Sequence, residues 1–270
     1  MRLKLFVASL FLSSTLLFAQ SAFDGTWHFN MDSAQLTDAN DKFSMENGTY
    51  RCDSCNPKVE VKADGRDHPR SGSPYSDTIN VRQISDREIE VINKKKGKVV
   101  GTNKMTVSAD GKTLTSEWES IFDNGQKGNG KVTEARVGNL PGNSMMASSN
   151  SKSSSKITGE WKPEKVNSAS ENVMTYTYKM TNDTFSMSSP QGTSYEAKLD
   201  GSDAPYKGDP GTTTVSVKKI DATHVDEFDK RDGKVIGIAH LSVDPDGKQL
   251  KLSYEDKLQG GTFNVTAEKQ

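Results

Sequence analysis

Two stretches with the same central turn decide the fold of this 270-residue chain: residues 105–118 read MTVSADGKTLTSEW, and residues 241–254 read LSVDPDGKQLKLSY. In each stretch an Asp-Gly pair, at 110–111 and at 246–247, separates two runs in which apolar and polar residues alternate. Asp-Gly between alternating runs is a strong signal for a β-hairpin, and the alternation gives each strand one buried face. Both stretches are therefore predicted to be antiparallel hairpins.

The two hairpins belong to a longer internal repeat. Residues 61–118 align with residues 197–254 without a gap, and about a third of the aligned positions are identical. Many identities are turn residues and their neighbours, such as Gly97-Lys98-Val99 against Gly233-Lys234-Val235. Shared turns between diverged strands indicate one fold made twice.

The N-terminal residues predict export from the cytoplasm. Arg2 and Lys4 precede an apolar run at 5–18, and small residues follow at Ala19, Ser21 and Ala22, where a signal peptidase would cut. The run is too short for a membrane span, which needs about 20 residues. We therefore expect a secreted or periplasmic protein whose mature chain has no membrane span. The predicted division is a signal peptide at 1–22, a first repeat at 23–137, a Ser/Asn/Gly-rich linker at 138–156 and a second repeat at 157–270.

Each repeat contains about eight short runs with strand character, separated by turn residues at the spacing typical of a sandwich or barrel. Sequential hairpins favour an up-and-down meander, and eight strands are enough to close a barrel. The predicted fold class is all-β, with two tandem antiparallel meander domains of about eight strands each. In the first repeat the predicted strands lie near 25–30, 42–50, 58–63, 78–84, 88–93, 99–107, 113–119 and 130–136.

A Gly-x-Trp motif opens each repeat, ending at Trp27 and Trp161, and a basic residue lies on each last strand, Arg136 and Lys269. Together with the meandering strands, this pattern resembles the lipocalin-like (calycin) β-barrels. The resemblance implies that each Trp plugs the closed end of a barrel under a stacked cation, which pairs Trp27 with Arg136 and Trp161 with Lys269. Such a contact contributes about 0.5–2 kcal/mol. The alternative is another β-sandwich, in which both Trp side chains are large core residues.

Few residues stand out as chemical sites. Cys52 and Cys55 are the only cysteines, and in an oxidising compartment we expect a structural disulfide, with a redox-active pair as the alternative. The stretch Asp226-Glu227-Phe228-Asp229 is interpreted as a solvated acidic face rather than a carboxylate pair. No nucleophile or phosphate-loop motif occurs, so no catalytic residue, metal or cofactor is predicted. The histidines lack metal-binding spacing: His28, His68, His224 and His240.

The balance of charges limits the possible partners. The chain has 35 basic and 36 acidic residues, and loss of Arg2 and Lys4 leaves a net charge of about −3. Nucleic acid is not expected to bind, since phosphate binding needs a concentrated basic face. We expect a non-catalytic, extracytoplasmic binding protein for a small apolar or amphipathic molecule. The alternatives are a secreted hydrolase or isomerase whose site is not visible as a motif, and an envelope interaction or structural module.

Overall fold

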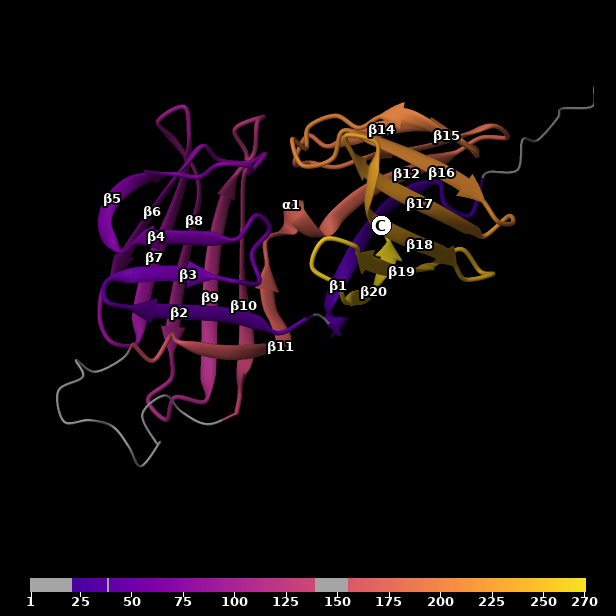
Figure 1. The fold of residues 1–270 in the computed structure, drawn as a ribbon. Helices are drawn as coiled ribbons and strands as arrows, with labels where there is room; N and C mark the ends of the chain where they lie inside the picture. Colours follow the sequence, from indigo (N-terminus) through magenta and orange to yellow (C-terminus); the bar gives the residue numbers. More distant parts are fainter. Residues whose placement is uncertain (1–20, 38, 139–154) are drawn as a thin grey trace, which may run out of the picture.

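The computed structural model describes residues 21–37, 39–138 and 155–270, and these form two antiparallel meander sheets (Figure 1). Each sheet is nearly closed into a barrel, which confirms the predicted all-β class, but each has ten strands rather than eight. The predicted signal peptide at 1–22 and linker at 138–156 lie almost entirely outside the described residues.

One turn and one further strand account for the two additional strands of the first sheet. The predicted strand at 42–50 is a hairpin, because Asn47 and Gly48 adopt positive φ angles of 51° and 73° and reverse the chain. Asn-Gly is the residue pair that a type I′ turn favours, and the signal was missed. A further strand forms from residues 64–69, between the predicted strands at 58–63 and 78–84.

Barrel 1 is the sheet with the strand order β4-β3-β2-β11-β10-β9-β8-β7-β6-β5. Alternate residues of its strands enter the core, as Ile79 and Val81 do in β6 and Ile89 and Val91 do in β7. The strands are β2 (Asp41–Glu46), β3 (Thr49–Cys52), β4 (Val59–Lys62), β5 (Asp64–Pro69), β6 (Thr78–Gln83), β7 (Glu88–Lys95), β8 (Lys98–Val107), β9 (Thr113–Ile121), β10 (Lys127–Val137) and β11 (Gly159–Ala169).

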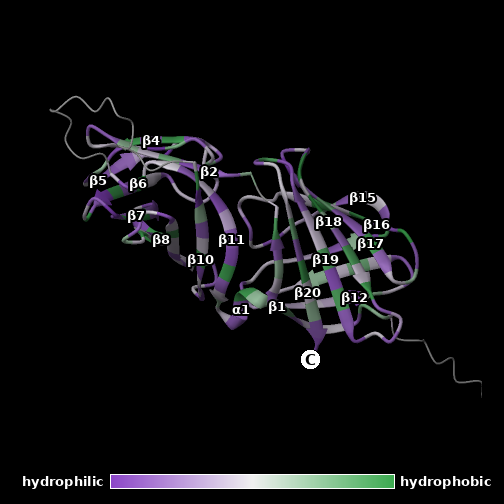
Figure 2. Cartoon of the chain, turned by 90° about the horizontal axis from the view of Figure 1, so that it is seen from below, coloured by the Kyte–Doolittle hydropathy of each residue, from purple (hydrophilic) through white to green (hydrophobic). Residues whose placement is uncertain are grey.

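Barrel 2 is the sheet with the strand order β14-β13-β12-β1-β20-β19-β18-β17-β16-β15. An isolated bridge between Ser194 and Lys207 brings its two edges together. Figure 2 shows hydrophobic and hydrophilic residues alternating along the strands, as one buried face requires. The strands are β1 (Gly25–Leu36), β12 (Thr175–Met180), β13 (Thr184–Ser188), β14 (Ser194–Lys198), β15 (Asp200–Pro205), β16 (Thr214–Lys219), β17 (His224–Arg231), β18 (Lys234–Val243), β19 (Gln249–Asp256) and β20 (Thr262–Lys269).

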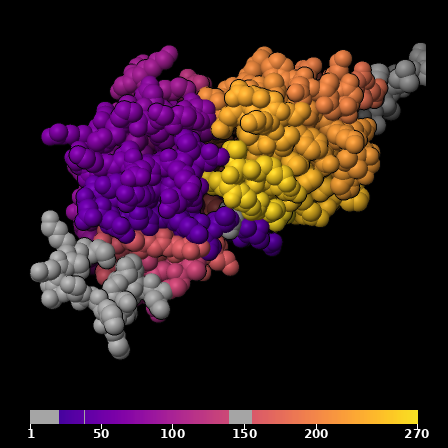
Figure 3. All heavy atoms as spheres, viewed as in Figure 1, coloured from indigo at the N-terminus to yellow at the C-terminus, as the bar shows by residue number. Residues whose placement is uncertain are grey.

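The two repeats exchange their first strands. β1, from the first repeat, pairs with β12 and β20 of barrel 2, and β11, from the second repeat, pairs with β10 and β2 of barrel 1. The barrels therefore do not coincide with the predicted segments 23–137 and 157–270. Barrel 1 is built from residues 41–169, inserted between β1 and the rest of barrel 2. The chain crosses back through the short helix α1 (Glu171–Met174), and the two lobes lie side by side (Figure 3).

The exchange changes the predicted tryptophan pairs. The guanidinium of Arg136 lies 3.9 Å from the ring centroid of Trp161, and the ammonium of Lys269 lies 4.8 Å from that of Trp27. The expected pairs, Trp27 with Arg136 and Trp161 with Lys269, are wrong because each first strand lies in the other repeat's barrel. The stacking of a basic residue on a fully buried Trp is nevertheless present in both barrels.

The two tryptophans are held by the same local hydrogen bond. The indole nitrogen of Trp27 donates to the carbonyl oxygen of Phe23 at 2.8 Å, and that of Trp161 donates to Ile157 at 3.0 Å. Phe23 and Ile157 are themselves fully buried. In each barrel the Trp side chain therefore bonds to the turn that precedes its strand, and its indole N–H has a hydrogen-bond acceptor inside the core.

Cys52 and Cys55 are joined in a disulfide at the end of β3. Cys52 is buried in the core of barrel 1, and its sulfur accepts a hydrogen bond from the backbone of Cys55 at 3.1 Å. In barrel 2 the position that corresponds to Cys52 is Met187, which follows from the strand register in the two sheets. Barrel 2 therefore has no equivalent bond. The disulfide is therefore a local addition to barrel 1.

Replacing both cysteines by alanine should lower the free energy of unfolding of barrel 1 by about 2 kcal/mol, because the bond closes a short loop. Urea unfolding followed by tryptophan fluorescence measures the loss. A reducing agent should cause the same loss in the parent protein and none in the Cys52→Ala/Cys55→Ala variant. Equal stability of parent and variant would show that the bond contributes nothing.

Candidate functional site

Barrel 2 contains a partly open cavity of about 210 Å³. Its walls come from β1, β12, β17, β18, β19 and β20, so the space lies inside the barrel. Along β1 it begins at Phe29, beyond the Trp27 plug. Most of the wall is apolar, and the only charged side chains that line it are Glu227 and Asp229. A concave, mostly apolar pocket with a few polar groups is the usual form of a small-molecule site.

Glu227 and Asp229 enter the cavity from the same strand, β17. They are two residues apart, so both point to one face of the sheet, and that face is the inner one. Only 7% of Glu227 is exposed, and Tyr195 donates a hydrogen bond to its Oε2 at 2.6 Å. The interpretation of this stretch as a solvated acidic face is therefore wrong for two of its residues, because the strand register turns them inward.

The two carboxyl groups are held in an environment that favours their protonated forms. Burial raises the pKa of Glu227 well above its usual range, and the neighbouring charge of Asp229 raises it further. Burial also raises the pKa of Asp229 to about 6, against the opposing effect of contacts with Glu227 and Tyr254. One oxygen of Asp229, Oδ1, is buried without a hydrogen-bond partner. Both carboxyl groups therefore keep their protons to a higher pH than exposed carboxyl groups do.

Aromatic rings surround the carboxyl pair. The cavity is lined by Phe29, Tyr176, Tyr178, Tyr206, Tyr254 and Phe263. The rings of Phe29 and Tyr176 meet edge to face with centroids 5.5 Å apart, and Tyr176 stacks on Tyr178 at 6.5 Å. These contacts position the rings against one another, and several ring faces and hydroxyl groups therefore border one small space.

A glycine makes room for one of these rings. Gly237 lies opposite Asp229 on β18, and a Cβ atom at this position would lie 1.9 Å from the hydroxyl oxygen of Tyr254. Any larger residue would displace Tyr254 from the cavity wall. Gly237 therefore maintains the contact between the carboxyl pair and the tyrosine.

Barrel 1 has different residues at the corresponding positions. Val91 and Asn93 replace the two carboxylates, and Trp118 replaces Tyr254, at the same offset as in the aligned repeat. Trp118 packs against Gly130, where a Cβ would lie 2.6 Å from its ring. The carboxylate pair is therefore specific to barrel 2 and is not a requirement of the fold.

A cleft of about 500 Å³ separates the barrels next to this cavity. Arg70 and Lys95 line it from barrel 1, and Asp209 lines it from barrel 2. Tyr176 and Tyr206 line both the cleft and the cavity, so these two rings stand between the spaces.

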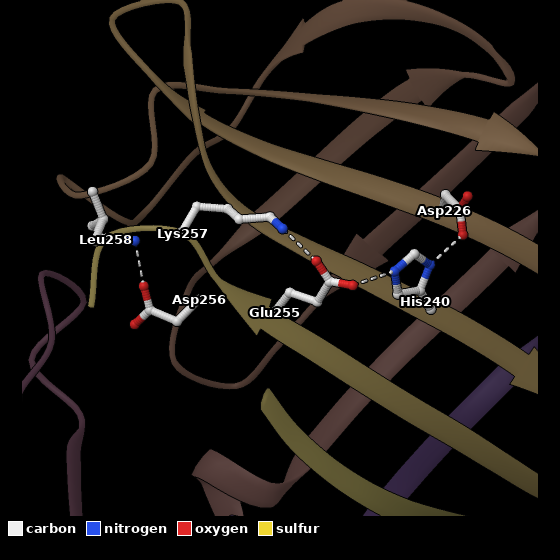
Figure 4. A network of polar contacts seen from close by, with 6 residues as sticks. All are labelled: Asp226, His240, Glu255, Asp256, Lys257 and Leu258. Atoms are coloured by element: carbon white, nitrogen blue, oxygen red, sulfur yellow. Dashed lines mark hydrogen bonds and ion pairs between the residues drawn. The ribbon is translucent and has the colours of Figure 1, made fainter. Parts of the chain in front are cut away.

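The most extensive histidine network among the described residues lies on the outer surface of barrel 2, on strands β17, β18 and β19. His240 Nδ1 lies 2.7 Å from Asp226, its Nε2 lies 3.4 Å from Glu255, and Lys257 bonds to the same glutamate (Figure 4). The hydrogen bond with Asp226 is the largest of the influences that raise the pKa of His240. The side chain of His240 is 43% exposed, so this is a surface network and contributes little to stability.

The other histidines each lie beside a single carboxylate and are not among the described residues that line the cavity. His28 contacts Glu171 at 2.8 Å, and His68 and His224 contact aspartates of their own loops or strands. In the described part of the chain no three His, Cys, Asp or Glu side chains are grouped to hold a metal ion. The four histidines are not brought together.

Comparisons with known proteins leave the resemblance resting on architecture. No protein-family model matches the chain, and no curated protein matches it. Across the described residues no helix is long and apolar enough to cross a membrane. The structure therefore supports two nearly closed ten-stranded β-barrels, each with a Trp–cation stack, and assigns no family.

Proposed function

We propose that this chain is an extracytoplasmic binding protein built from two lipocalin-like barrels, and that barrel 2 binds a small amphipathic molecule. The observation that carries the proposal is the cavity inside barrel 2, which has mostly apolar walls and two carboxyl groups from one strand. At about 210 Å³ it is smaller than the roughly 300–1,000 Å³ of pockets for drug-sized molecules, so the ligand is small.

Export supports the same proposal. The N-terminal sequence has the three parts of a signal peptide, and the Cys52–Cys55 bond is of a kind that persists in oxidising compartments. Binding then occurs outside the cytoplasm. The energy of binding comes from apolar burial against the aromatic wall, and the carboxyl pair orients the ligand.

A second candidate function is a hydrolase or isomerase, and the carboxyl pair is the observation in its favour. Two adjacent buried carboxyls with unequal proton affinities are suited to general acid–base catalysis. Against this candidate, the cavity wall offers no nucleophile besides tyrosine and carboxylate. Conversion of a bound molecule by the parent protein, and its absence in Glu227→Gln, would favour the enzyme.

Filling the cavity should abolish ligand binding. Ala239 lines the cavity and is 6% exposed, so a leucine there would occupy part of the space. We expect native mass spectra of the protein purified from an exporting host to show a bound small molecule in the parent and none in Ala239→Leu. Asn103 is the corresponding residue of barrel 1, and Asn103→Leu is the matched control that should retain the ligand.

A ligand retained by Ala239→Leu but lost from Asn103→Leu would move the site to barrel 1. A clean mass for the parent, unchanged after incubation with a lipid and metabolite extract, would contradict a carrier. The better hypothesis for the function would then be an envelope interaction or structural module.

A further inference from the structure

We propose that the cavity of barrel 2 is selective for a small organic ammonium ion, which pairs with Glu227 and Asp229 and lies against the surrounding aromatic rings. This inference rests on the proposed binding function and specifies its ligand class. It is argued from the missing countercharge, the ring arrangement and the size of the space.

The carboxyl pair has no countercharge inside the barrel. No Lys, Arg or His lines the cavity, and the nearest strand neighbours of Glu227 and Asp229 on β18 are Ala239 and Gly237. A buried carboxylate needs a cation or several hydrogen bonds, and Asp229 Oδ1 has neither. A cationic ligand would supply the missing partner.

The groups that face the pair are otherwise neutral or acidic. Tyr195 from β14 bonds to Glu227, Tyr254 from β19 contacts Asp229, and Tyr206 lies between the cavity and the cleft. The adjacent cleft carries both signs of charge, because Arg70 and Lys95 line it together with Asp209. Inside the cavity the carboxyl pair supplies the charge of the described lining, and this favours a cation over a carboxylate or phosphate.

The aromatic wall complements the same charge. Cations bind over the faces of Tyr and Phe rings, and desolvated sites strengthen this attraction. Tyr176 and Tyr178 are stacked, with Phe29 edge-on to the first of them, beside the carboxyl pair. A neutral apolar ligand would use the rings and leave the carboxyls unpaired, whereas an organic ammonium ion uses both.

An organic cation fits better than a metal ion. Hard metal ions take six or more oxygen ligands, and the described residues contain no group of three acidic, histidine or cysteine side chains suited to one. The space of about 210 Å³ is far larger than a bare ion needs and has mostly apolar walls. A small alkyl or arylalkyl amine, or a small quaternary ammonium compound, matches the size and the lining.

Binding of the cation should release a proton. Without a ligand, burial beside Asp229 favours the protonated form of Glu227. The described residues that line the cavity include no Lys, Arg or His, and the neighbouring basic groups are Arg70 and Lys95 in the cleft and Arg231, which bonds to the loop at Gly211. The ligand favours the ionised form, so affinity should rise by up to about tenfold per pH unit while that proton is still bound. A quaternary ligand keeps its charge at every pH and isolates this effect.

The test compares charged and neutral ligands of the same shape on the full mature chain by isothermal titration calorimetry. The probes are choline with 3,3-dimethylbutan-1-ol, and 2-phenylethylamine with 2-phenylethanol. We expect each cation to bind at least tenfold more tightly than its neutral partner. Choline affinity should increase between pH 5 and pH 8, with heats that depend on the buffer because a proton is released.

Two isosteric variants assign the effect to the pair. Glu227→Gln and Asp229→Asn keep shape and hydrogen bonding, and each should weaken cation binding by about tenfold or more and reduce its pH dependence. Glu134→Gln removes a buried carboxyl from barrel 1 and is the matched control, which should bind cations like the parent. Near-ultraviolet circular dichroism checks that each variant is folded, and the second variant keeps the test valid if the first is not.

The outcomes separate the two proposals. Equal binding of charged and neutral probes, unchanged in both variants, would overturn the cation inference and leave the binding function standing. Failure of every probe, in a protein that also carries no copurified molecule, would overturn both. Preference for the cations that disappears in Glu227→Gln or Asp229→Asn supports the inference.

Discussion

Replacing Trp27 by alanine should unfold barrel 2, although Trp27 belongs to the first repeat. Its indole is fully buried, stacks under Lys269 and donates a hydrogen bond to Phe23. Truncation of a buried Trp typically costs about 3–5 kcal/mol, which is a large part of the stability of one domain. Trp161→Ala should cause the same loss in barrel 1, which is formed mainly by the first repeat.

Amide hydrogen exchange with mass spectrometry distinguishes the two barrels. In Trp27→Ala, exchange should accelerate in β12 and β20, the partners of β1, while β2 and β10 keep their protection. In Trp161→Ala the pattern should be reversed, since β11 pairs with β2 and β10. Each variant is the control for the other. Faster exchange of β2 and β10 in Trp27→Ala would contradict the strand exchange.

The exchange has a consequence for how the barrels depend on one another. Residues 41–169 form barrel 1 as one continuous stretch, whereas barrel 2 needs β1 from before it and β12 to β20 from after it. Opening barrel 1 does not remove a strand from barrel 2, but displacing β1 does. The proposed binding site is therefore in the barrel that needs segments from both sides of barrel 1 in the sequence.

The turn residues made most of the fold predictable from sequence. Gly111 and Gly247 adopt the positive φ angles, 73° and 69°, that the two Asp-Gly hairpins need, and β8–β9 and β18–β19 form there. Asn47-Gly48 carried the same kind of signal inside a predicted strand, and this is why one strand became two. Local turn chemistry thus determines the strand count.

The strand exchange could not be predicted in this way. The first strands of both repeats carry Gly-x-Trp, and the last strands both carry a basic residue at the stacking position. Either first strand satisfies either barrel locally, so pattern alone does not choose between the exchanged and the unexchanged pairing. Which barrel a first strand joins depends on the segments that connect the barrels, such as the one after β1. The periodicity of apolar residues carries no information about those connections.

The candidate site was missed for a different reason, although a signal was present. Three acidic residues among the four at 226–229 look solvated when that stretch is taken alone. In the aligned repeat, however, Glu227 corresponds to Val91, an apolar residue on an alternating strand. Transfer of that inward position to barrel 2 would have placed Glu227 and Asp229 inside. The alignment of the two repeats therefore predicts the orientation of these side chains better than their charge does.

The second large effect is expected in barrel 1, where Glu134 is buried at 4% exposure and its Oε2 has no hydrogen-bond partner. Burial raises the pKa of Glu134 to about 8, and the nearby Asp41, whose own pKa is raised by burial, adds to the rise. In the unfolded chain the glutamate loses its proton near pH 4.3. The folded protein therefore binds more protons than the unfolded one between about pH 4.3 and 8, and stability falls as pH rises through this window.

Glu134→Gln should remove this dependence, because an amide stays neutral. We expect the variant to match the parent near pH 4.5 and to exceed it by a few kcal/mol at pH 8.5, at about 1.4 kcal/mol per unit of pKa difference as an upper limit. Urea unfolding from pH 4.5 to 8.5, followed by tryptophan fluorescence, reports mainly on barrel 1, which contains Trp118 and Trp161. Glu117→Gln, at an exposed position paired with Lys131, is the control and should leave the pH dependence unchanged. If parent and Glu134→Gln lose stability equally with rising pH, Glu134 is not the group whose titration lowers the stability. Its carboxyl group would then be better solvated than its 4% exposure implies.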